Sequence, residues 1–529
     1  MQRITLVFTF LLSAGFGLVS CGSNNNGVGD GGLIDFGPGS CTLKGVDPSC
    51  DKPCSGDADC PDSLYCSMGK CAAQCTADAP CPSGYACAKG RCLHVTGSDP
   101  GKDPSSCTNL QCRQLDCTPA GGSSTTITGK VYAPNGTLPL YNAIVYVPNQ
   151  PTTALVEGVT CDVCGAQQSG QPIAATISGT DGSFTLQNVP VSDNLPLVIQ
   201  VGKWRRQITV PKVTACTTQT ITDVNMTRLP RTKAEGDMPK MAIATGKADP
   251  FECLLRKIGI ADSEITLPTG NGRVHFYHLN GKNMQPAAPQ ADDATNGLYS
   301  SLDKLKTYDV VMLPCEGGPT LDNKSDAQLK NIVDYTTAGG RIFTTHFSYT
   351  WLTKLTSNEP APPFPGVVNW DVSGPDPSTP YYGTIDTTFP KGMAFSQWMS
   401  NVGALETMGA GAGKLSIAEP RHDVLTVIDP PAKRWIYSDT GNQPKIVQHF
   451  TFNTPLSGAA LDDGGMPIEC GRVVYSDFHV SAGATQAGNF PMSCKDEPLT
   501  PDEKALVFML FDLSACVQND NTPVGPPIQ

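Results

Sequence analysis

Short apolar runs alternate with amphipathic segments between residues 241 and 517. Strand patterns occur at 240–246, 273–279, 309–314, 341–347, 445–452 and 471–480, and helix patterns at 250–260, 300–308, 325–340 and 500–517. The last helix begins at Thr500, and Glu503 follows three residues later, which is a capping-box pattern. Strands that alternate with helices predict a doubly wound, mostly parallel, flavodoxin-like α/β domain over 241–517.

A different period marks residues 125–230, where apolar and polar positions alternate one by one. Turn signals at Asn135-Gly136 and Asp181-Gly182 interrupt the alternation. This pattern predicts an antiparallel β-sandwich. A Gly/Ser stretch at 118–124 precedes the sandwich, and a charged linker with two prolines follows it at 229–240.

Cysteine, rather than hydrophobic patterning, defines residues 41–117. The spacing C-x5-C-x5-C-x4-C occurs twice at an offset of 21 residues, and the words between the cysteines also repeat. The eight cysteines are Cys54, Cys60, Cys66, Cys71, Cys75, Cys81, Cys87 and Cys92. Few apolar residues lie between them, so disulfides are expected to hold the module together. Zinc is the alternative, but the spacing lacks the C-x2-C pattern of zinc knuckles. The pattern resembles small EGF-like or dickkopf-like modules, which serve as spacers or protein contacts.

The first residues have the order of an export signal: a charge at Arg3, an apolar run from Ile4 to Val19, then small residues. The run is short for a membrane span. The sequence Leu18-Val19-Ser20-Cys21 resembles the lipobox of bacterial lipoproteins. That resemblance implies removal of residues 1–20, acylation of Cys21 and a flexible tether over 21–40. An ordinary signal peptide with an incidental cysteine is the alternative. The expected location is the cell envelope, at the outer membrane of a Gram-negative bacterium.

Composition agrees with export. The chain has 529 residues and 22 cysteines, a number that favours an oxidising compartment and disulfides. The net charge of −12 argues against nucleic acid or anionic lipid as a partner, so attachment to a membrane is expected through the lipid anchor alone. Residues 518–529 are expected to form a disordered tail.

The sandwich sequence resembles the carboxypeptidase regulatory-like (transthyretin-like) domain through the words GKVYAPNG, TDGSFTLQNVP and VIQVGKW. The resemblance implies structural roles: Asp181 and Gly182 form a turn and Phe184 faces the core. The cluster Trp204-Arg205-Arg206 has two interpretations, either a sugar or anion contact or an exposed strand end with a packed tryptophan.

The α/β sequence resembles the class I glutamine amidotransferase-like superfamily, and in style its trehalose-utilisation (ThuA-like) branch. The words that carry the resemblance are YDVVMLPCEGG, VDYTTAGGRIFTTHFSYTWL and GRVVYSDFHV. Amidotransferases place a nucleophilic cysteine at a strand-to-helix elbow and a histidine after a later strand. Here the elbow holds His346, with no cysteine or serine at its tip, so glutaminase activity is not expected.

Four polar residues follow predicted strand ends in this domain: Glu316, His346, Asp477 and His479. The carboxyl ends of parallel strands converge on the ligand crevice of an open α/β sheet. Glu316, His346 and His479 are apt ligands for a metal such as zinc, and they also suit acid–base work. The alternative is that they are hydrogen-bonded residues inherited from an ancestral enzyme fold. No catalytic residue is assigned.

The α/β domain has five cysteines, and helix and strand positions suggest how they pair. Cys253 is expected to pair with Cys516, and Cys315 with Cys494, which leaves Cys470 over. An unpaired Cys315 beside two histidines would instead be a candidate nucleophile. Behind Cys21 stand 21 cysteines, an odd number, so at least one thiol stays free if every bridge is intramolecular.

Three functions remain open from sequence. The first is a non-enzymatic surface lipoprotein that binds a protein or glycan through a degenerate amidotransferase-like domain. The second is a hydrolase or metal-dependent enzyme that acts on carbohydrate at the strand-end crevice. The third is a structural component of the envelope.

Overall fold

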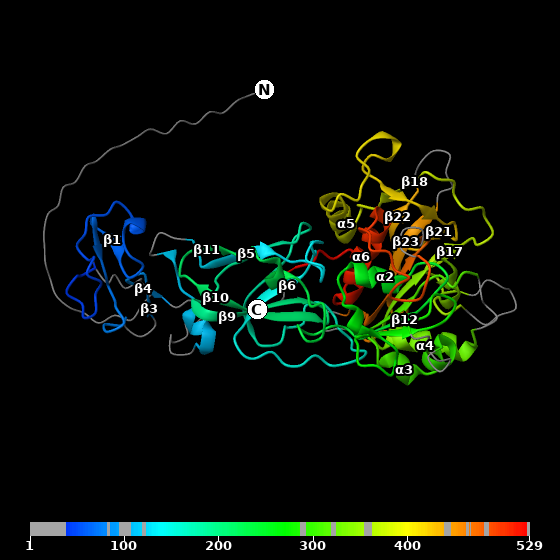
Figure 1. Ribbon diagram of the computed structural model, residues 1–529, viewed down its shortest axis with the longest axis horizontal. Coiled ribbons are helices and arrows are strands. Elements are labelled where there is room, and N and C mark those ends of the chain that lie inside the picture. Colours follow the sequence, from blue (N-terminus) through cyan, green and yellow to red (C-terminus); the bar gives the residue numbers. More distant parts are fainter. Residues whose placement is uncertain are drawn as a thin grey trace, which may run out of the picture.

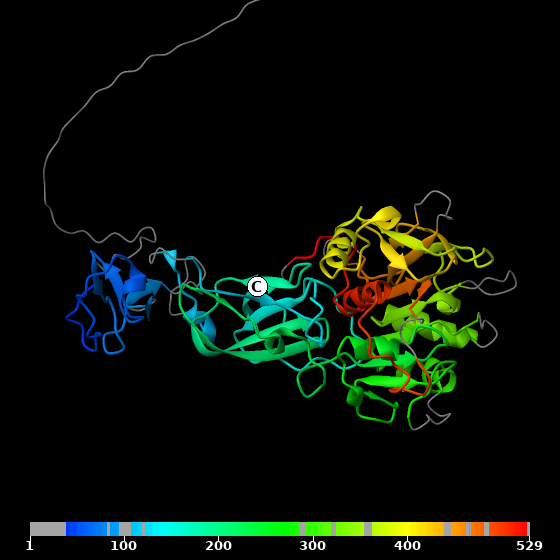
Figure 2. The same ribbon diagram turned by 45° about the horizontal axis from the view of Figure 1, so that its top comes forward.

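The computed structural model describes residues 39–81, 85–94, 107–118, 123–285, 293–318, 324–353, 362–438, 446–461, 465, 467–480 and 486–525. The predicted signal segment, Cys21 and most of the tether lie outside these ranges. Within them, no helix is both long and apolar enough to cross a membrane. Three bodies follow one another along the long axis of the molecule: the cysteine-rich module, the sandwich and the α/β domain (Figures 1 and 2). The chain is therefore multidomain, as predicted.

Disulfides hold the cysteine-rich module, as its spacing predicts. The two repeats share one connectivity, in which the first cysteine joins the third and the second joins the fourth: Cys54–Cys66, Cys60–Cys71, Cys75–Cys87 and Cys81–Cys92. Each repeat contains a short hairpin, and the elements are η1 (Asp57–Asp59), β1 (Tyr65–Ser67), β2 (Lys70–Ala72), β3 (Tyr85–Ala88) and β4 (Arg91–His94). Cys41–Cys50 bridges the first turn of the module.

The second body is a sandwich of two sheets. Its strands are β5 (Thr126–Lys130), β6 (Ile144–Pro148), β7 (Pro172–Ile177), β8 (Ser183–Leu186), β9 (Ser192–Val201), β10 (Trp204–Val213) and β11 (Thr218–Thr220), preceded by η3 (Asn109–Arg113) and followed by α1 (Val224–Thr227). One sheet has the order β10-β9-β6-β7 and the other β11-β5-β8. All neighbours are antiparallel except β11 and β5, which are parallel. Phe184 is buried and Gly182 occupies the turn with φ +78°, as predicted.

The predicted basic cluster at the start of β10 is not a surface patch. Trp204 is fully buried, with its ring 6.1 Å from that of Phe511 in the α/β domain. Arg205 is buried as well and forms an ion pair with Asp237. The tryptophan is packed, as the second interpretation expects, but Trp204 and Arg205 are buried, so this strand end is not exposed. Trp204 helps to join the two domains.

The third body is built on a ten-stranded mixed sheet with the order β13-β14-β12-β15-β16-β24-β23-β22-β18-β19. The strands from β13 to β24 pair in parallel, and each later strand runs antiparallel to its neighbour. Their bounds are β12 (Met241–Ala244), β13 (Ile265–Thr266), β14 (Val274–Tyr277), β15 (Val310–Leu313), β16 (Arg341–Thr345), β18 (Tyr381–Ile385), β19 (Leu415–Ile417), β22 (Ala432–Tyr437), β23 (Val447–Thr454) and β24 (Gly471–Ser476).

Helices cover both faces of this sheet. They are α2 (Phe251–Lys257), α3 (Leu302–Lys306), α4 (Asp326–Thr337), α5 (Pro390–Asn401) and α6 (Pro501–Ser514), with short helical turns at η5 (Asp262–Glu264), η7 (Thr295–Tyr299), η9 (His346–Trp351) and η10 (Gly409–Gly411). Successive residues of β12 face opposite sides, so Ile243 packs in the core that contains α2 and α6, and Ala242 in the core that contains α3 and α4. The Thr500–Glu503 capping box is present at the start of α6.

Two strand pairs lie outside the main sheet. The pair β17 (Val368–Trp370) with β21 (Val424–Val427) and the pair β20 (Glu419–Pro420) with β25 (Phe478–His479) are both antiparallel. The second pair matters most for the site, because it brings the residues after Pro420 beside those just before Phe478.

The disulfide pairing expected in the α/β domain is wrong. Cys253 joins Cys494, and Cys315 is free. The insertion between β6 and β7 carries two cysteines across to the α/β domain, where Cys161 joins Cys470 and Cys164 joins Cys516. The prediction pairs cysteines within one domain, whereas Cys470 and Cys516 bond to cysteines of the sandwich insertion. Cys117–Cys216 and Cys107–Cys112 complete the ten disulfides of the described residues.

The first part of the predicted disordered tail is also ordered. The Gln518 carbonyl oxygen accepts from Asn453 Nδ2 over 3.2 Å, and Asp520 is buried with an oxygen 2.9 Å from the guanidinium of Arg472. A buried arginine needs such a partner, so residues 518–520 belong to the domain.

Candidate metal centre

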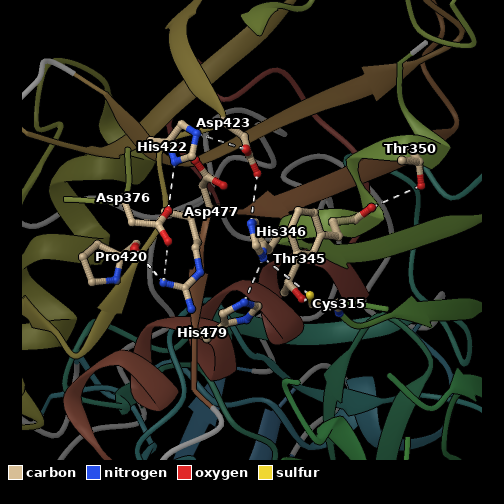
Figure 3. A network of polar contacts seen from close by, with 12 residues as sticks. Cys315, Thr345, His346, Thr350, Asp376, Pro420, His422, Asp423, Asp477 and His479 are labelled. Atoms are coloured by element: carbon tan, nitrogen blue, oxygen red, sulfur yellow. Dashed lines mark hydrogen bonds and ion pairs between the residues drawn. The ribbon is translucent and has the colours of Figure 1, made fainter. Parts of the chain in front are cut away.

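The centre lies at the carboxyl ends of three adjacent parallel strands. Cys315 follows β15, His346 follows β16, and His479 lies three residues beyond the end of β24 (Figure 3). All three side chains are buried, with at most 5 % of any residue exposed. The carboxyl ends of adjacent parallel strands therefore bring these three side chains together.

His346 stands at the elbow between β16 and η9 with φ +37°, a left-handed conformation that few residues adopt. The hydroxyl of Tyr475 donates to the His346 carbonyl oxygen over 3.1 Å. This elbow is the place where the amidotransferase resemblance expects a nucleophile, and it presents an imidazole instead.

Three potential metal-ligand atoms lie close together at the elbow. The Nδ1 atom of His346 lies 2.9 Å from Nε2 of His479 and 3.5 Å from Sγ of Cys315. All three atoms lie within 4.8 Å of one another. Thiolate sulfur and imidazole nitrogen are the donors that zinc prefers.

The outer nitrogen of each ring faces a carboxylate. His479 Nδ1 donates to Asp249 Oδ2 over 2.7 Å, and His346 Nε2 lies 3.4 Å from Asp423 Oδ2. Asp249 is itself fixed, because it accepts from the Thr345 hydroxyl (2.6 Å) and the Val480 amide (2.8 Å). With protons on both outer nitrogens, the two inner nitrogens face each other as lone pairs. Such an approach is repulsive unless a proton or a cation lies between them.

When a proton lies between the two inner nitrogens, burial and the neighbouring charges decide which histidine carries it. Burial alone would lower the pKa of His479, but the Asp249 carboxylate outweighs it and raises the pKa to about 10. Burial and the neighbouring charge of His479 lower the pKa of His346 to about 2. The metal-free pair is then an imidazolium at His479 that donates to a neutral His346. In the metal-free protein a proton therefore lies between the two inner nitrogens, at the point where the three potential ligand atoms converge.

A second polar group lies on the other side of His346. Asp423 and Asp477 are buried in mutual contact, and the Tyr475 hydroxyl oxygen lies 3.0 Å from Asp477 Oδ1. Burial raises the pKa of Asp423 to about 6, and burial together with Asp423 raises that of Asp477 well above its usual value. The neighbouring His422 places Nδ1 2.9 Å from Asp376 Oδ1 (Figure 3).

Of the four residues predicted from the sequence, His346 and His479 are in direct contact. Asp477 contacts Asp423, whose carboxylate faces His346. Glu316 is not part of the cluster: its carboxylate accepts from Trp351 Nε1 and binds Lys324 Nζ, each over 3.0 Å. Cys315, one residue earlier in the chain, takes its place.

Sequence reasoning missed Asp249, Asp423 and His422. Asp249 follows β12 at its carboxyl end, so the strand-end rule applied to every strand would have found it. Asp423 follows β20, a two-residue strand whose partner is distant in sequence, and no local pattern indicates that pairing.

No protein-family model and no curated protein matches the chain. Among solved structures, the cytoplasmic protein STM3548 from Salmonella typhimurium is 12% identical with a TM-score of 0.25, covering 52% of this chain and 98% of that one. A type II cohesin–X-dockerin complex from Acetivibrio cellulolyticus is 13% identical with a TM-score of 0.12, covering 28% of this chain and 79% of that one. Likenesses this low carry no conclusion about fold or function.

Proposed function

We propose that the α/β domain binds a divalent transition metal, with zinc as the natural choice, in an exported envelope protein. The ligands are Cys315 Sγ, His346 Nδ1 and His479 Nε2. One observation carries the proposal: two imidazole nitrogens face each other over 2.9 Å while each opposite nitrogen faces a carboxylate. Carboxylate–histidine–metal arrangements of this kind fix the tautomer and orientation of metal ligands.

Three protein ligands leave the fourth position of a tetrahedral zinc site for water or a bound molecule. This supports the alternative of a metal-dependent enzyme, such as a hydrolase acting on carbohydrate. A zinc site with an open position also suits a protein that only binds its target, and the missing thiol or hydroxyl at the elbow supports a binding protein over a glutaminase. A glycan or a protein is the proposed partner.

The metal proposal is tested by reconstituting the purified full-length mature protein with Co²⁺ and Zn²⁺. One equivalent of tightly bound metal is expected, with a thiolate-to-cobalt absorption band that disappears in Cys315→Ser. His346→Ala and His479→Ala are expected to lose the metal. His275→Gln is the matched control, because His275 is another buried histidine of the same sheet and its Nδ1 bonds the Tyr308 hydroxyl. Absence of the band in the wild-type protein, or its survival in both histidine variants, would refute the proposal.

The envelope location is part of the same proposal. Ten disulfides among the described residues support an oxidising compartment. The lipobox-like sequence supports acylation of Cys21. Labelled palmitate is expected to be incorporated in the membrane fraction and to be lost in Cys21→Ala, whereas incorporation that persists would exclude this anchor.

The relationship of the α/β domain to flavodoxin-like and amidotransferase-like proteins also stands as a proposal. Its support is the order of the parallel strands, β14-β12-β15-β16-β24, which matches the 2-1-3-4-5 order of that architecture. The left-handed elbow at His346 is a second support. The carboxypeptidase regulatory-like identity of the sandwich rests on its turn at Gly182 and the buried Phe184.

A further inference from the structure

A cavity of about 330 Å³ lies where the sandwich meets the α/β domain. Its walls come from the sandwich strand ends at 142–144 and 200–202, from the insertion between 162 and 168, and from the chain after α6 between 515 and 525. The disulfide Cys164–Cys516 joins two of these walls. Ligand pockets have volumes of about 300 to 1,000 Å³ and are common at domain interfaces. The cavity therefore has the size and the position of a pocket for a small ligand.

Four side-chain amides line this cavity: Asn142, Gln168, Gln200 and Gln518. Gln200 is 9 % exposed, its Nε2 donates to the carbonyl oxygen of Gly202, and its Oε1 has no hydrogen-bond partner among the described residues. Gln168 and Gln518 likewise use only their Nε2 groups, each as a donor to a nearby carbonyl oxygen. Buried acceptors without a donor are rare and need an explanation. The cavity thus presents amide oxygens that are free to accept hydrogen bonds from a ligand.

The charges around the cavity favour a neutral ligand. Among the described residues that line it, none is a lysine, an arginine or a histidine, and Asp162 is the one charged residue. The guanidinium of Arg341 is close enough to interact with the charge of Asp162, and the two residues line a small adjoining space. Enclosing an anion without a cationic partner is costly, so phosphates and carboxylates are poor ligands for this cavity. Because Arg341 already compensates Asp162, a cationic ligand is not required either.

We infer that this cavity binds a neutral sugar residue, such as the end of a glycan chain. A sugar ring carries several hydroxyl groups in a small volume, and each of them can donate to an amide oxygen. A peptide of the same size offers only about one backbone donor per residue, so it matches the four amides less well. The apolar side chains of Ile144, Val201 and Val524 also line the cavity and suit the C–H groups of the ring. Val163 at its border is 37 % exposed, so a ligand can enter from solvent.

The sugar site is separate from the proposed zinc centre. Ala515 borders the cavity, and its carbonyl oxygen accepts from the guanidinium of Arg341 over 2.6 Å. Arg341 is the first residue of β16, whereas His346 follows the last residue of that strand. The cavity therefore lies toward the opposite end of the parallel strands from the metal ligands. The inference gives a glycan partner a binding place of its own, and it does not depend on the metal.

The test applies the full-length mature protein to an array of neutral and acidic glycans and measures the best ligand by calorimetry. Neutral glycans are expected to bind in preference to acidic ones. Gln200→Met and Asn142→Gly are expected to weaken binding about tenfold, because each removes an amide from the cavity. Glycine suits position 142, where φ is +58°. Ala166→Trp places a large ring in the cavity wall and is expected to abolish binding. Gln207→Ala is the matched control, since Gln207 is an exposed amide of the neighbouring strand β10.

The outcomes separate this inference from the metal proposal. Sugar binding that survives in Cys315→Ser supports the cavity site even if the cobalt band never appears, a result that would refute only the metal centre. No binding to any neutral glycan of the array, a preference for acidic glycans, or equal binding by the wild type, Gln200→Met and Ala166→Trp overturns the sugar site. The cavity would then hold water only. Circular dichroism of each variant shows that a loss of binding is not a loss of fold.

Discussion

The Nδ1 atom of His346 lies 2.9 Å from the Nε2 atom of His479, and the opposite nitrogen of each ring faces an aspartate. The two rings meet nearly edge to face, at 80° between their planes. Two lone pairs at this distance repel each other, so a proton or a cation must lie between the two nitrogens. With Cys315 Sγ alongside, this place suits a metal ion.

Replacing Asp249 tests whether the outer carboxylate supports this centre. Asp249→Asn keeps an oxygen for the Val480 amide but removes the charge that holds His479 Nδ1–H. Zinc affinity, measured by competition with a chromophoric chelator, is expected to fall about 10- to 100-fold. Asp262→Asn, which alters an exposed ion pair with Arg256, is expected to leave the affinity unchanged. Unchanged affinity in Asp249→Asn would show that His479 is not a ligand.

Thiol chemistry tests the environment of Cys315, which is 1 % exposed and is the free cysteine of the described residues. The native protein is expected to react negligibly with iodoacetamide at position 315. The denatured, unreduced protein is expected to react there fully. Peptide mapping reads both results, and a Cys315 that stays unmodified after denaturation would mean that it is disulfide-bonded after all.

His449 gives a prediction about acid stability. It is buried, its Nδ1 bonds the Ser476 hydroxyl, and burial together with Arg472 lowers its pKa to about 3. The unfolded chain takes up a proton at this histidine below about pH 6.5, but the folded chain does not. The free energy of unfolding therefore falls as the pH drops from about 6.5 to about 3, by up to about 1.4 kcal/mol per pH unit from this group.

The measurement is urea unfolding across that pH range, in chelator, for the wild-type protein and His449→Gln. The variant is expected to show the shallower dependence, because glutamine does not titrate. Identical slopes would mean that His449 titrates alike in the folded and unfolded states.

The sequence predicts local elements of this protein well, for a physical reason. Each of the six α/β strand patterns corresponds to a strand, and the four helix patterns to helices, because burial on both faces of a sheet requires continuous apolar runs. The prediction of a mostly parallel sheet needs correction. Four strands at one end of the sheet run antiparallel to their neighbours, so the sheet is mixed. Three of them, β18, β19 and β22, lie in a region where no element was predicted.

The candidate site likewise contains residues that local sequence patterns predict and residues that they do not. His346 and His479 follow strands with strong patterns, so their convergence could be predicted. Asp423 reaches the site through the pairing of β20 with β25, which depends on residues about 60 positions apart and on no local propensity. The free state of Cys315 could not be predicted, because no local pattern indicates that Cys161 and Cys164 of the sandwich insertion bond to Cys470 and Cys516 of the α/β domain.

That insertion leads to the last prediction. Cys161–Cys470 and Cys164–Cys516 close loops of 309 and 352 residues and attach the sandwich to the α/β domain. Long loops lose the most unfolded-state entropy when they are closed. Replacing Cys164 and Cys516 together by serine is expected to lower the free energy of unfolding by about 2–4 kcal/mol. It is also expected to make the insertion at 149–171 more sensitive to limited proteolysis.

The matched control removes Cys107–Cys112, whose sequence separation is only 5. A loop this short restricts the unfolded chain little, so the control is expected to destabilise the protein less than the interdomain pair does. Both variants are compared by denaturant unfolding and by mapping the first proteolytic cut. If both disulfides had equal effects, or if the first cut of the interdomain variant fell outside the insertion, Cys164–Cys516 would not be what holds the insertion against the α/β domain. The remaining disulfide Cys161–Cys470 and the apolar contact between Trp204 and Phe511 would then account for the attachment of the two domains.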